Sequence, residues 1–280
     1  MCRFVLYLGP SIHIATLVTE PRHSLIHQSY HAKEREEPLN GDGFGVGWYA
    51  DGVNDPAVFR DVTPAWNNAN LLEVVRVTTS QCVLANVRAA SPGLPVTQLN
   101  CHPFAADGLL FVHNGYVAGF PELVRPLRAG LSDEVWRSVR GSTDSEHVFA
   151  LLRDRLDAGA RHDLSALAGA MRAAIIEVER LRRDAGISTS SMLNLALTDG
   201  TRAVVSRYVS EADDEPNSLY VHAGRRYVCH DGVCQMVDPD CAEGAVIVAS
   251  EPLSGDQGWD RVPRNHLVLI DNGVVRLEAV

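Results

Sequence analysis

The order of the predicted elements indicates an α+β fold in which helices cover two sheets. Short apolar runs typical of buried strands occupy both ends of the sequence, and two long segments with helical periodicity lie between them. Strands first, helices in the middle and strands again favour this class. Because no abrupt change in composition marks a linker, we expect the 280 residues to form a single domain over residues 1–280.

Charge and hydropathy narrow the range of partners. The formal net charge is −10 and the sequence pI is near 5.5, whereas nucleic acid or an anionic membrane would require a basic face. The N-terminus lacks the basic and apolar regions of an export signal, and no run approaches the roughly 18 apolar residues of a membrane span. We therefore expect a cytoplasmic protein with a small-molecule substrate, no nucleic acid and no membrane.

The six cysteines are expected to be reduced thiols, because a chain of this size without an export signal rarely carries a disulfide framework. Cys229, Cys234 and Cys241 lie close enough in sequence to raise the alternative of a zinc site. Their spacing lacks the tight C-x2-C pairs of structural zinc sites. Ordinary strand or loop cysteines and no metal are the prediction.

Residues 2–8 predict a buried strand that ends at Gly9-Pro10 and has Cys2 at its start. If Met1 is removed, Cys2 carries a thiol and a free α-amine on one residue. Such an amine has an unperturbed pKa of roughly 7.7–8.0 and is a usable general base, and this pairing is a known catalytic unit. The alternative is a Met-Cys start without catalytic meaning, which these two residues alone favour.

Residues 40–49 place four glycines in a turn that leads into a strand. No Gly-Lys-Ser/Thr follows, so this is not a phosphate loop, and the spacing suits close approach of backbone to backbone or of backbone to ligand. Other elements predicted in this half are a helix at 12–18, an exposed loop at 23–39, a strand at 58–60, a helix at 69–77, and a strand at 81–88 that ends at Arg88.

A buried strand at residues 109–113 is predicted to end at Asn114-Gly115. The asparagine side-chain amide and the unobstructed glycine N–H are the donors that an oxyanion hole requires. The alternative is a plain Asn-Gly hairpin turn, which the dipeptide alone favours.

The middle of the chain predicts two helices. Thr143 and Glu146 fit a capping box at the start of the first, where Asp144 also suits the helix dipole. The second covers about residues 163–184 with one apolar stripe. The strands predicted after them are 192–197, 203–208, 219–222, 245–249, 267–270 and 274–277.

In order and spacing, these motifs resemble the class II glutamine amidotransferases, which are N-terminal-nucleophile hydrolases. The likeness is greatest to a stand-alone branch that includes the amidotransferase-type subunit of the cytosolic glutathione-degrading complex and the γ-glutamyl amidase of ergothioneine biosynthesis. Of these two, the sequence is more similar to the glutathione-degrading subunit. The segments that carry it, besides Cys2, Arg88 and Asn114-Gly115, are Met-Cys-Arg-Phe (1–4), Asn-Gly-Asp-Gly (40–43), Thr-Pro-Ala-Trp-Asn-Asn (63–68), Asn-Cys-His-Pro-Phe (100–104), Gly-Ser-Thr-Asp-Ser-Glu (141–146), Val-Ser-Arg-Tyr (205–208) and Ala-Ser-Glu-Pro-Leu (249–253).

The resemblance implies a four-layer αββα sandwich of two mainly antiparallel sheets. It implies that Cys2 attacks the γ-carbonyl of a glutamyl amide and that its α-amine relays the proton, so that a γ-glutamyl thioester forms and is hydrolysed. It further implies that Asn114 and Gly115 stabilise the oxyanion, Arg88 binds the substrate α-carboxylate and Asp144 binds its α-ammonium. A guanidinium at a strand end can hold a carboxylate through two hydrogen bonds. No cofactor is expected.

The chain departs from the family after Arg88. Ammonia-channelling members usually have an aromatic residue and then Ala-Thr-His-Gly, whereas this sequence has Ala89-Ala90-Ser91-Pro92-Gly93, in which Ser91 can replace the threonine hydroxyl. The prediction is hydrolysis of glutathione or a related γ-glutamyl compound, with a partner peptidase as a candidate subunit and a homo-oligomer compatible with it. The alternatives are a glutaminase subunit that delivers ammonia to a separate synthase chain, and a catalytically silent scaffold.

Overall fold

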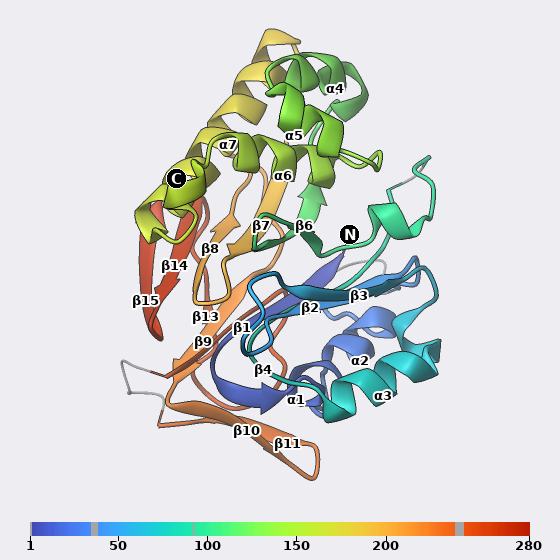
Figure 1. The fold of residues 1–280 in the computed structure, drawn as a ribbon, viewed down its shortest axis with the longest axis vertical. Helices are drawn as coiled ribbons and strands as arrows, with labels where there is room; N and C mark the ends of the chain where they lie inside the picture. Colours follow the sequence, from blue (N-terminus) through green and yellow to red (C-terminus); the bar gives the residue numbers. More distant parts are fainter. Residues whose placement is uncertain (1, 35–38, 92, 239–243) are drawn as a thin grey trace.

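The computed structural model describes residues 2–34, 39–91, 93–238 and 244–280. Met1, whose removal the sequence predicts, lies outside these ranges. Within them the chain forms a seven-stranded sheet, a six-stranded sheet and a two-stranded hairpin, with helices on the outer faces (Figure 1).

The seven-stranded sheet has the order β13-β9-β12-β1-β4-β2-β3 and is antiparallel throughout its paired strands. β1 lies at its centre, where Val5 pairs with Ala249 on one side and with Ala85 on the other. The strands are β1 (Arg3–His13), β2 (Phe44–Trp48), β3 (Ala57–Asp61), β4 (Thr79–Val87), β9 (Tyr220–Gly224), β12 (Ala245–Ala249) and β13 (Asp260–Arg261).

The six-stranded sheet has the order β15-β14-β8-β7-β6-β5 and is also antiparallel. Its strands are β5 (Phe104–Ala106), β6 (Leu109–Tyr116), β7 (Met192–Thr198), β8 (Arg202–Arg207), β14 (His266–Asp271) and β15 (Val274–Ala279). The chain therefore contributes strands from both of its ends to the seven-stranded sheet, and the helical middle segment interrupts the six-stranded one.

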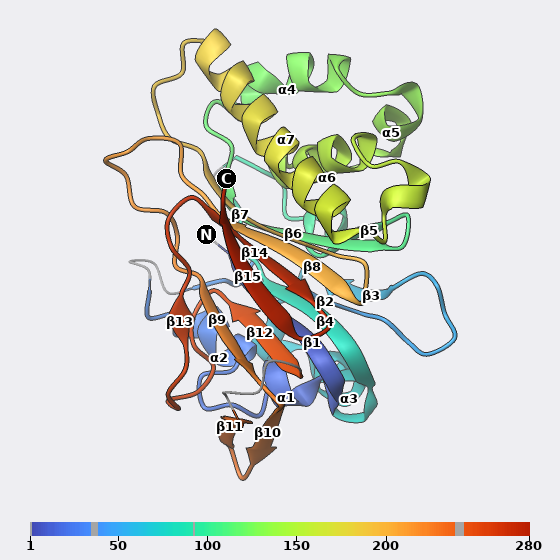
Figure 2. The same ribbon diagram turned by 90° about the vertical axis from the view of Figure 1, so that its left-hand side faces the viewer.

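Three apolar clusters separate four layers, which Figure 2 shows edge-on. Phe4, Leu84 and Val112 belong to the cluster between the sheets. The outer face of the seven-stranded sheet packs on α1 (Ala15–Val18), α2 (Leu25–Tyr30) and α3 (Ala69–Val77). The outer face of the six-stranded sheet packs on α4 (Phe120–Ala129), α6 (Asp144–Asp154) and α7 (Leu164–Asp184), and α5 (Asp133–Ser138) lies against α6. Short 3-10 turns occupy Ala65–Asn67, Gln98–Asn100 and Ala158–Ala160. The predicted αββα sandwich is confirmed.

The glycines of β2 let another segment approach its backbone closely. A Cβ on Gly45 would lie 2.0 Å from the backbone oxygen of His102, and one on Gly47 would lie 2.9 Å from the Leu110 side chain. Gly45 therefore excludes any side chain, because its neighbour is backbone, and β2 lies against the segment that leads into the six-stranded sheet. Of the two readings of the glycine-rich turn, the structure supports contact between backbone segments.

Several element boundaries predicted from the sequence are wrong. β1 continues through Gly9-Pro10 to His13, so the helix predicted at 12–18 begins only at Ala15. Beyond Leu8, β1 no longer pairs with β12, and the missing N–H of Pro10 therefore removes no ladder bond there. Helix α2 lies inside the loop predicted at 23–39, whose residues 35–38 lie outside the described ranges. Helices α4 and α5 were not predicted.

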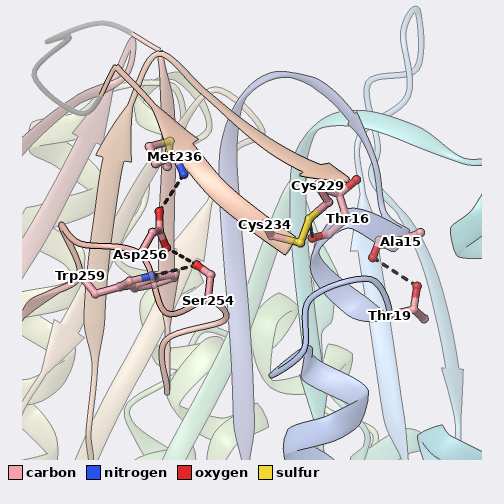
Figure 3. The surroundings of a disulfide bond; sticks show 9 residues. All are labelled: Ala15, Thr16, Thr19, Cys229, Cys234, Met236, Ser254, Asp256 and Trp259. Atoms are coloured by element: carbon pink, nitrogen blue, oxygen red, sulfur yellow. Dashed lines mark hydrogen bonds between the residues drawn. A yellow bond between two sulfur atoms is a disulfide. The ribbon is translucent and has the colours of Figure 1, made fainter. Parts of the chain in front are cut away.

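The cysteine prediction also requires correction, because Cys229 and Cys234 form a disulfide (Figure 3). They are opposite one another in the unpredicted hairpin of β10 (Arg226–His230) and β11 (Val233–Val237), with Cα atoms 4.0 Å apart. Of the four residues between them, His230 and Val233 pair with each other, and Asp231-Gly232 forms a two-residue hairpin turn. Cys2, Cys82 and Cys101 are free, and Cys241 lies outside the described ranges.

The hairpin rests on the outer helical layer. The Cys229 sulfur lies 3.6 Å from the backbone oxygen of Thr16 in α1, and the Asp256 carboxylate accepts a hydrogen bond from the Met236 N–H at 2.9 Å (Figure 3). Across the described part of the chain, no three His, Cys, Asp or Glu side chains are grouped as metal ligands. None of the described helices is long and apolar enough to cross a bilayer.

Candidate active site

A cavity of about 570 Å³ opens where β1 begins and β6 ends, and its wall includes Cys2, Ser91, Gly115 and Asp144. These residues come from four separate parts of the sequence, so the fold brings together four of the six residues predicted for the site. The rest of the wall is largely apolar and includes Leu94, Tyr116, Phe120 and Pro121. A cavity of this size is typical of small-molecule sites.

Cys2 directly precedes β1, and 7% of its surface is exposed. Its sulfur lies 3.8 Å from the backbone oxygen of Ala89, and its own backbone oxygen accepts a hydrogen bond from the Arg3 guanidinium at 3.1 Å. Cys82 and Cys101 are fully buried, and burial raises the pKa of both thiols, that of Cys82 to about 12. Among the free cysteines that the structure describes, Cys2 is the one whose thiol lines the cavity.

Asn114 and Gly115 lie inside β6, where they pair with Asn194 and Leu193 of β7, so the hairpin-turn reading is wrong. Gly115 has a φ of 155°, and a Cβ there would lie 1.8 Å from the backbone oxygen of Met192. Only glycine fits this position, and Gly115 belongs to the cavity wall. The Asn114 side chain is fully buried behind the wall.

Asp144 is the first residue of α6, as the capping pattern predicted. The Thr143 hydroxyl accepts the Glu146 N–H at 3.2 Å, which confirms the cap. The reciprocal bond of a capping box is absent from the described contacts, because the Glu146 carboxylate accepts the N–H groups of Arg140 and Gly141 instead. One Asp144 oxygen accepts the Val117 N–H at 2.8 Å, which fixes the carboxylate on the cavity wall.

Arg88 follows β4 but is buried and does not belong to the cavity wall. Its guanidinium donates to the backbone oxygen of Asp42 at 3.3 Å, and its backbone N–H donates to the backbone oxygen of Gly43 at 2.8 Å. The Asp42 carboxylate accepts the Ala90 N–H at 2.8 Å. The turn at 40–43 therefore holds the segment that leads to the exposed Ser91.

Sequence reasoning missed a buried carboxylate that binds Arg3, the residue after Cys2. The Glu251 side chain, which is 1% exposed, accepts hydrogen bonds from Arg3 Nε at 2.8 Å, the Lys33 N–H at 2.9 Å and the Glu34 N–H at 3.1 Å, and lies 2.7 Å from His23 Nε2. Burial opposes ionisation, but these donors and the Arg3 charge outweigh it and lower the pKa of Glu251 to about 2. The signal that could have indicated it is the polar pair Ser250-Glu251 directly after the apolar strand β12. Arg88 and Asn114 were indicated by the same pattern, a polar residue at the end of a buried strand.

A four-layer sandwich with Cys2 directly before its central strand, and with Cys2 and Gly115 on the wall of one cavity, is the arrangement of an N-terminal-nucleophile amidohydrolase. Residues 17–280 match the family model of the class II glutamine amidotransferases, and the chain belongs to this family. The match begins after Cys2 and includes Arg88, Asn114, Gly115 and Asp144.

Two curated relatives and one solved structure place the chain within the family. The chain is 36% identical to the probable glutamine amidotransferase DUG3 of Saccharomyces cerevisiae, over 100% of this chain and 84% of the yeast protein. It is 31% identical to the gamma-glutamyl-hercynylcysteine sulfoxide hydrolase of Mycolicibacterium smegmatis, over 96% and 95% of the two chains. The glutamine aminotransferase class-II domain protein of Silicibacter pomeroyi superposes on 99% of the chain with a TM-score of 0.69 at 28% identity. The family resemblance seen in the sequence is confirmed.

Proposed function

We propose that this enzyme hydrolyses the γ-glutamyl amide bond of glutathione or a related γ-glutamyl compound and releases glutamate. The observation that carries the proposal is the single cavity whose wall holds Cys2, Gly115 and Asp144. A thiol, an oxyanion donor and a fixed carboxylate are the groups needed to cleave an amide that carries a free α-ammonium. The Mycolicibacterium relative, whose name describes γ-glutamyl hydrolysis, supports the same substrate class.

In the proposed reaction, the Cys2 sulfur adds to the γ-carbonyl carbon, and the thiol proton passes through water to the α-amine of Cys2. The Asn114 amide and the Gly115 N–H stabilise the negative oxygen of the tetrahedral intermediate. Its collapse breaks the C–N bond, and the leaving amine takes the proton. Water then hydrolyses the thioester, which returns the thiol and releases glutamate. Removal of one oxyanion donor typically raises the barrier by about 2.7–4 kcal/mol.

Substrate recognition in this proposal uses the two ends of the glutamyl head group. Asp144 faces the cavity and would bind the α-ammonium. Arg88 would bind the α-carboxylate, which requires its guanidinium to exchange the Asp42 backbone oxygen for the substrate. Ser91 is exposed on the wall and can add a hydroxyl hydrogen bond. The apolar remainder of the wall, around Phe120, would accept the leaving group.

The direct test measures glutamate and ammonia after incubation of the processed protein with glutathione or with glutamine. Intact-mass measurement must first show that the chain starts at Cys2, and Cys2→Ala is the inactive control. Glutamate release from glutathione supports the proposal. If neither substrate releases glutamate, even with a candidate partner peptidase present, the proposal is wrong.

The same assay addresses the alternative function as a glutaminase subunit that passes ammonia to a synthase chain. That function predicts that glutamine outcompetes larger γ-glutamyl amides. The replacement of the family's aromatic residue after Arg88 by Ala89 favours hydrolysis of the larger amides. Three expectations from the sequence remain predictions: a cytoplasmic location, a partner subunit and a homo-oligomer.

A further inference from the structure

Ser250 connects the two sheets at the candidate active site. It follows β12 directly, its N–H donates to the Phe4 oxygen at 3.0 Å, and its hydroxyl accepts the Phe4 N–H at 3.0 Å. The same hydroxyl oxygen accepts a hydrogen bond from Asn114 Nδ2 at 3.3 Å. Phe4 lies two residues after Cys2, and Asn114 directly precedes Gly115. One buried hydroxyl therefore joins the strand of the nucleophile to the strand of the oxyanion donors.

The Asn114 side chain depends on this hydroxyl for its orientation. Within the described ranges, Ser250 Oγ is the hydrogen-bond partner of the Asn114 amide, and the buried Asn114 Oδ1 has no partner. An asparagine amide with only its Nδ2 hydrogen-bonded can rotate about χ2. This rotation exchanges the positions of the Nδ2 donor and the Oδ1 acceptor. A carbonyl oxygen turned toward a developing oxyanion repels it, so the orientation matters for the reaction.

We propose that Ser250 is a positioning residue for the formation of the thioester. Its hydroxyl accepts one Nδ2 proton of Asn114 and leaves the second proton to bind the oxyanion that forms when the Cys2 sulfur adds to the γ-carbonyl. It also fixes β1 against β6, which sets the separation of the nucleophile from the donor. The inference rests on the proposed function. Ser250 is fully buried, lies off the cavity wall and exchanges no proton with the substrate.

The test is a double-mutant cycle on glutathione hydrolysis. Because a small misplacement of a reacting group costs up to about 100-fold, we expect Ser250→Ala to lower kcat by about 10- to 100-fold with KM changed less than about 3-fold. Asn114→Ala is expected to lower kcat by about 100- to 1,000-fold. In the Asn114→Ala background, Ser250→Ala should then cost less than about 3-fold, since the group that it positions is absent. Ser250→Cys, which keeps a weak hydrogen-bonding group, should be intermediate.

Two further measurements separate positioning from a general loss of structure. Alkylation of Cys2 by iodoacetamide forms no oxyanion, so its rate in Ser250→Ala should stay within about 2-fold of the wild type. The matched control is Ser206→Ala, which also removes a fully buried hydroxyl that accepts a backbone N–H, that of Leu195. We expect Ser206→Ala to lower thermal stability by a similar amount and to leave kcat unchanged.

The link can also be observed without turnover. The side-chain amide resonances of Asn114, assigned by their loss in Asn114→Ala, should shift in Ser250→Ala and not in Ser206→Ala. Full activity of Ser250→Ala, additive losses in the cycle, or unshifted amide resonances would overturn the inference. Absence of glutamate release by the wild-type enzyme from both substrates would instead refute the proposed function, and the resonances would still decide whether Ser250 orients Asn114.

Discussion

Glu251→Gln tests whether the buried carboxylate that binds Arg3 stabilises the fold. The substitution keeps the shape of the side chain and removes its charge, which leaves Arg3, 2% exposed, without its counter-ion. It also places a glutamine NH2, a hydrogen-bond donor, where the Lys33 and Glu34 N–H groups need an acceptor. Breaking a buried ion pair at one partner typically costs about 3–5 kcal/mol, and we expect a loss of unfolding free energy in this range.

The pH dependence of stability gives a second value for the contribution of Glu251 to the free energy of unfolding. The pKa of Glu251 falls from 4.5 to about 2 in the folded protein. Because the folded pKa is the lower one, the stabilisation is complete above pH 4.5 and is lost as the pH falls toward 2. Two and a half pH units correspond to about 3 kcal/mol, which agrees with the range expected for the broken pair.

Urea unfolding followed by circular dichroism at pH values from 7 to 3 measures both quantities. The Glu251→Gln variant is expected to unfold at lower urea at pH 7 and to lose less stability than the wild type between pH 4.5 and pH 3. Glu73→Gln, which removes an exposed carboxylate paired with Arg76, should change stability by less than about 1 kcal/mol. Equal urea midpoints for Glu251→Gln and the wild type at pH 7 would refute the reasoning.

Three other predictions concern the cavity. Gly115→Ala would place a Cβ 1.8 Å from the Met192 oxygen, so we expect a fall in thermal stability and no measurable turnover; a folded variant of wild-type activity contradicts the close approach. Asp144→Asn should lower kcat/KM for glutathione by about 10- to 100-fold, the usual worth of a charged hydrogen bond, while the exposed Asp133→Asn leaves it unchanged. A chain with an uncleaved residue before Cys2 should be inactive, because its nitrogen becomes an amide without basicity; intact mass and turnover measured on one sample check this.

The sequence was most informative where local chemistry decides structure. The boundaries of α3 at Ala69–Val77 and of β12 at Ala245–Ala249 agree with the prediction. Asn68 caps the start of α3, and β12 is a continuous apolar run that follows Gly244. The cap of α6 by Thr143 also agrees, because it needs only residues three positions apart. Such features depend on neighbours along the chain and not on the rest of the fold.

Features that depend on distant partners could not be predicted. Asn114-Gly115 lies in a strand because β7 pairs with it, although the dipeptide alone favours a turn. Pro10 is tolerated in β1 because no neighbouring strand needs its N–H. Cys229 and Cys234 pair because a hairpin brings their Cα atoms to 4.0 Å, which spacing alone does not reveal. In each case tertiary pairing overrides the local preference.

The topology of the central sheet explains why the candidate residues meet. β1 is flanked by β12 and β4, both antiparallel to it, so the start of β1 lies beside the ends of both neighbours. The residues that follow those ends, Arg88 and Ser250, therefore come to the strand that begins after Cys2. Arg3 pairs with Val87, and a slip of β1 by one residue would turn its side chains to the opposite face. The register that packs Phe4 between the sheets thus also determines which groups lie near Cys2.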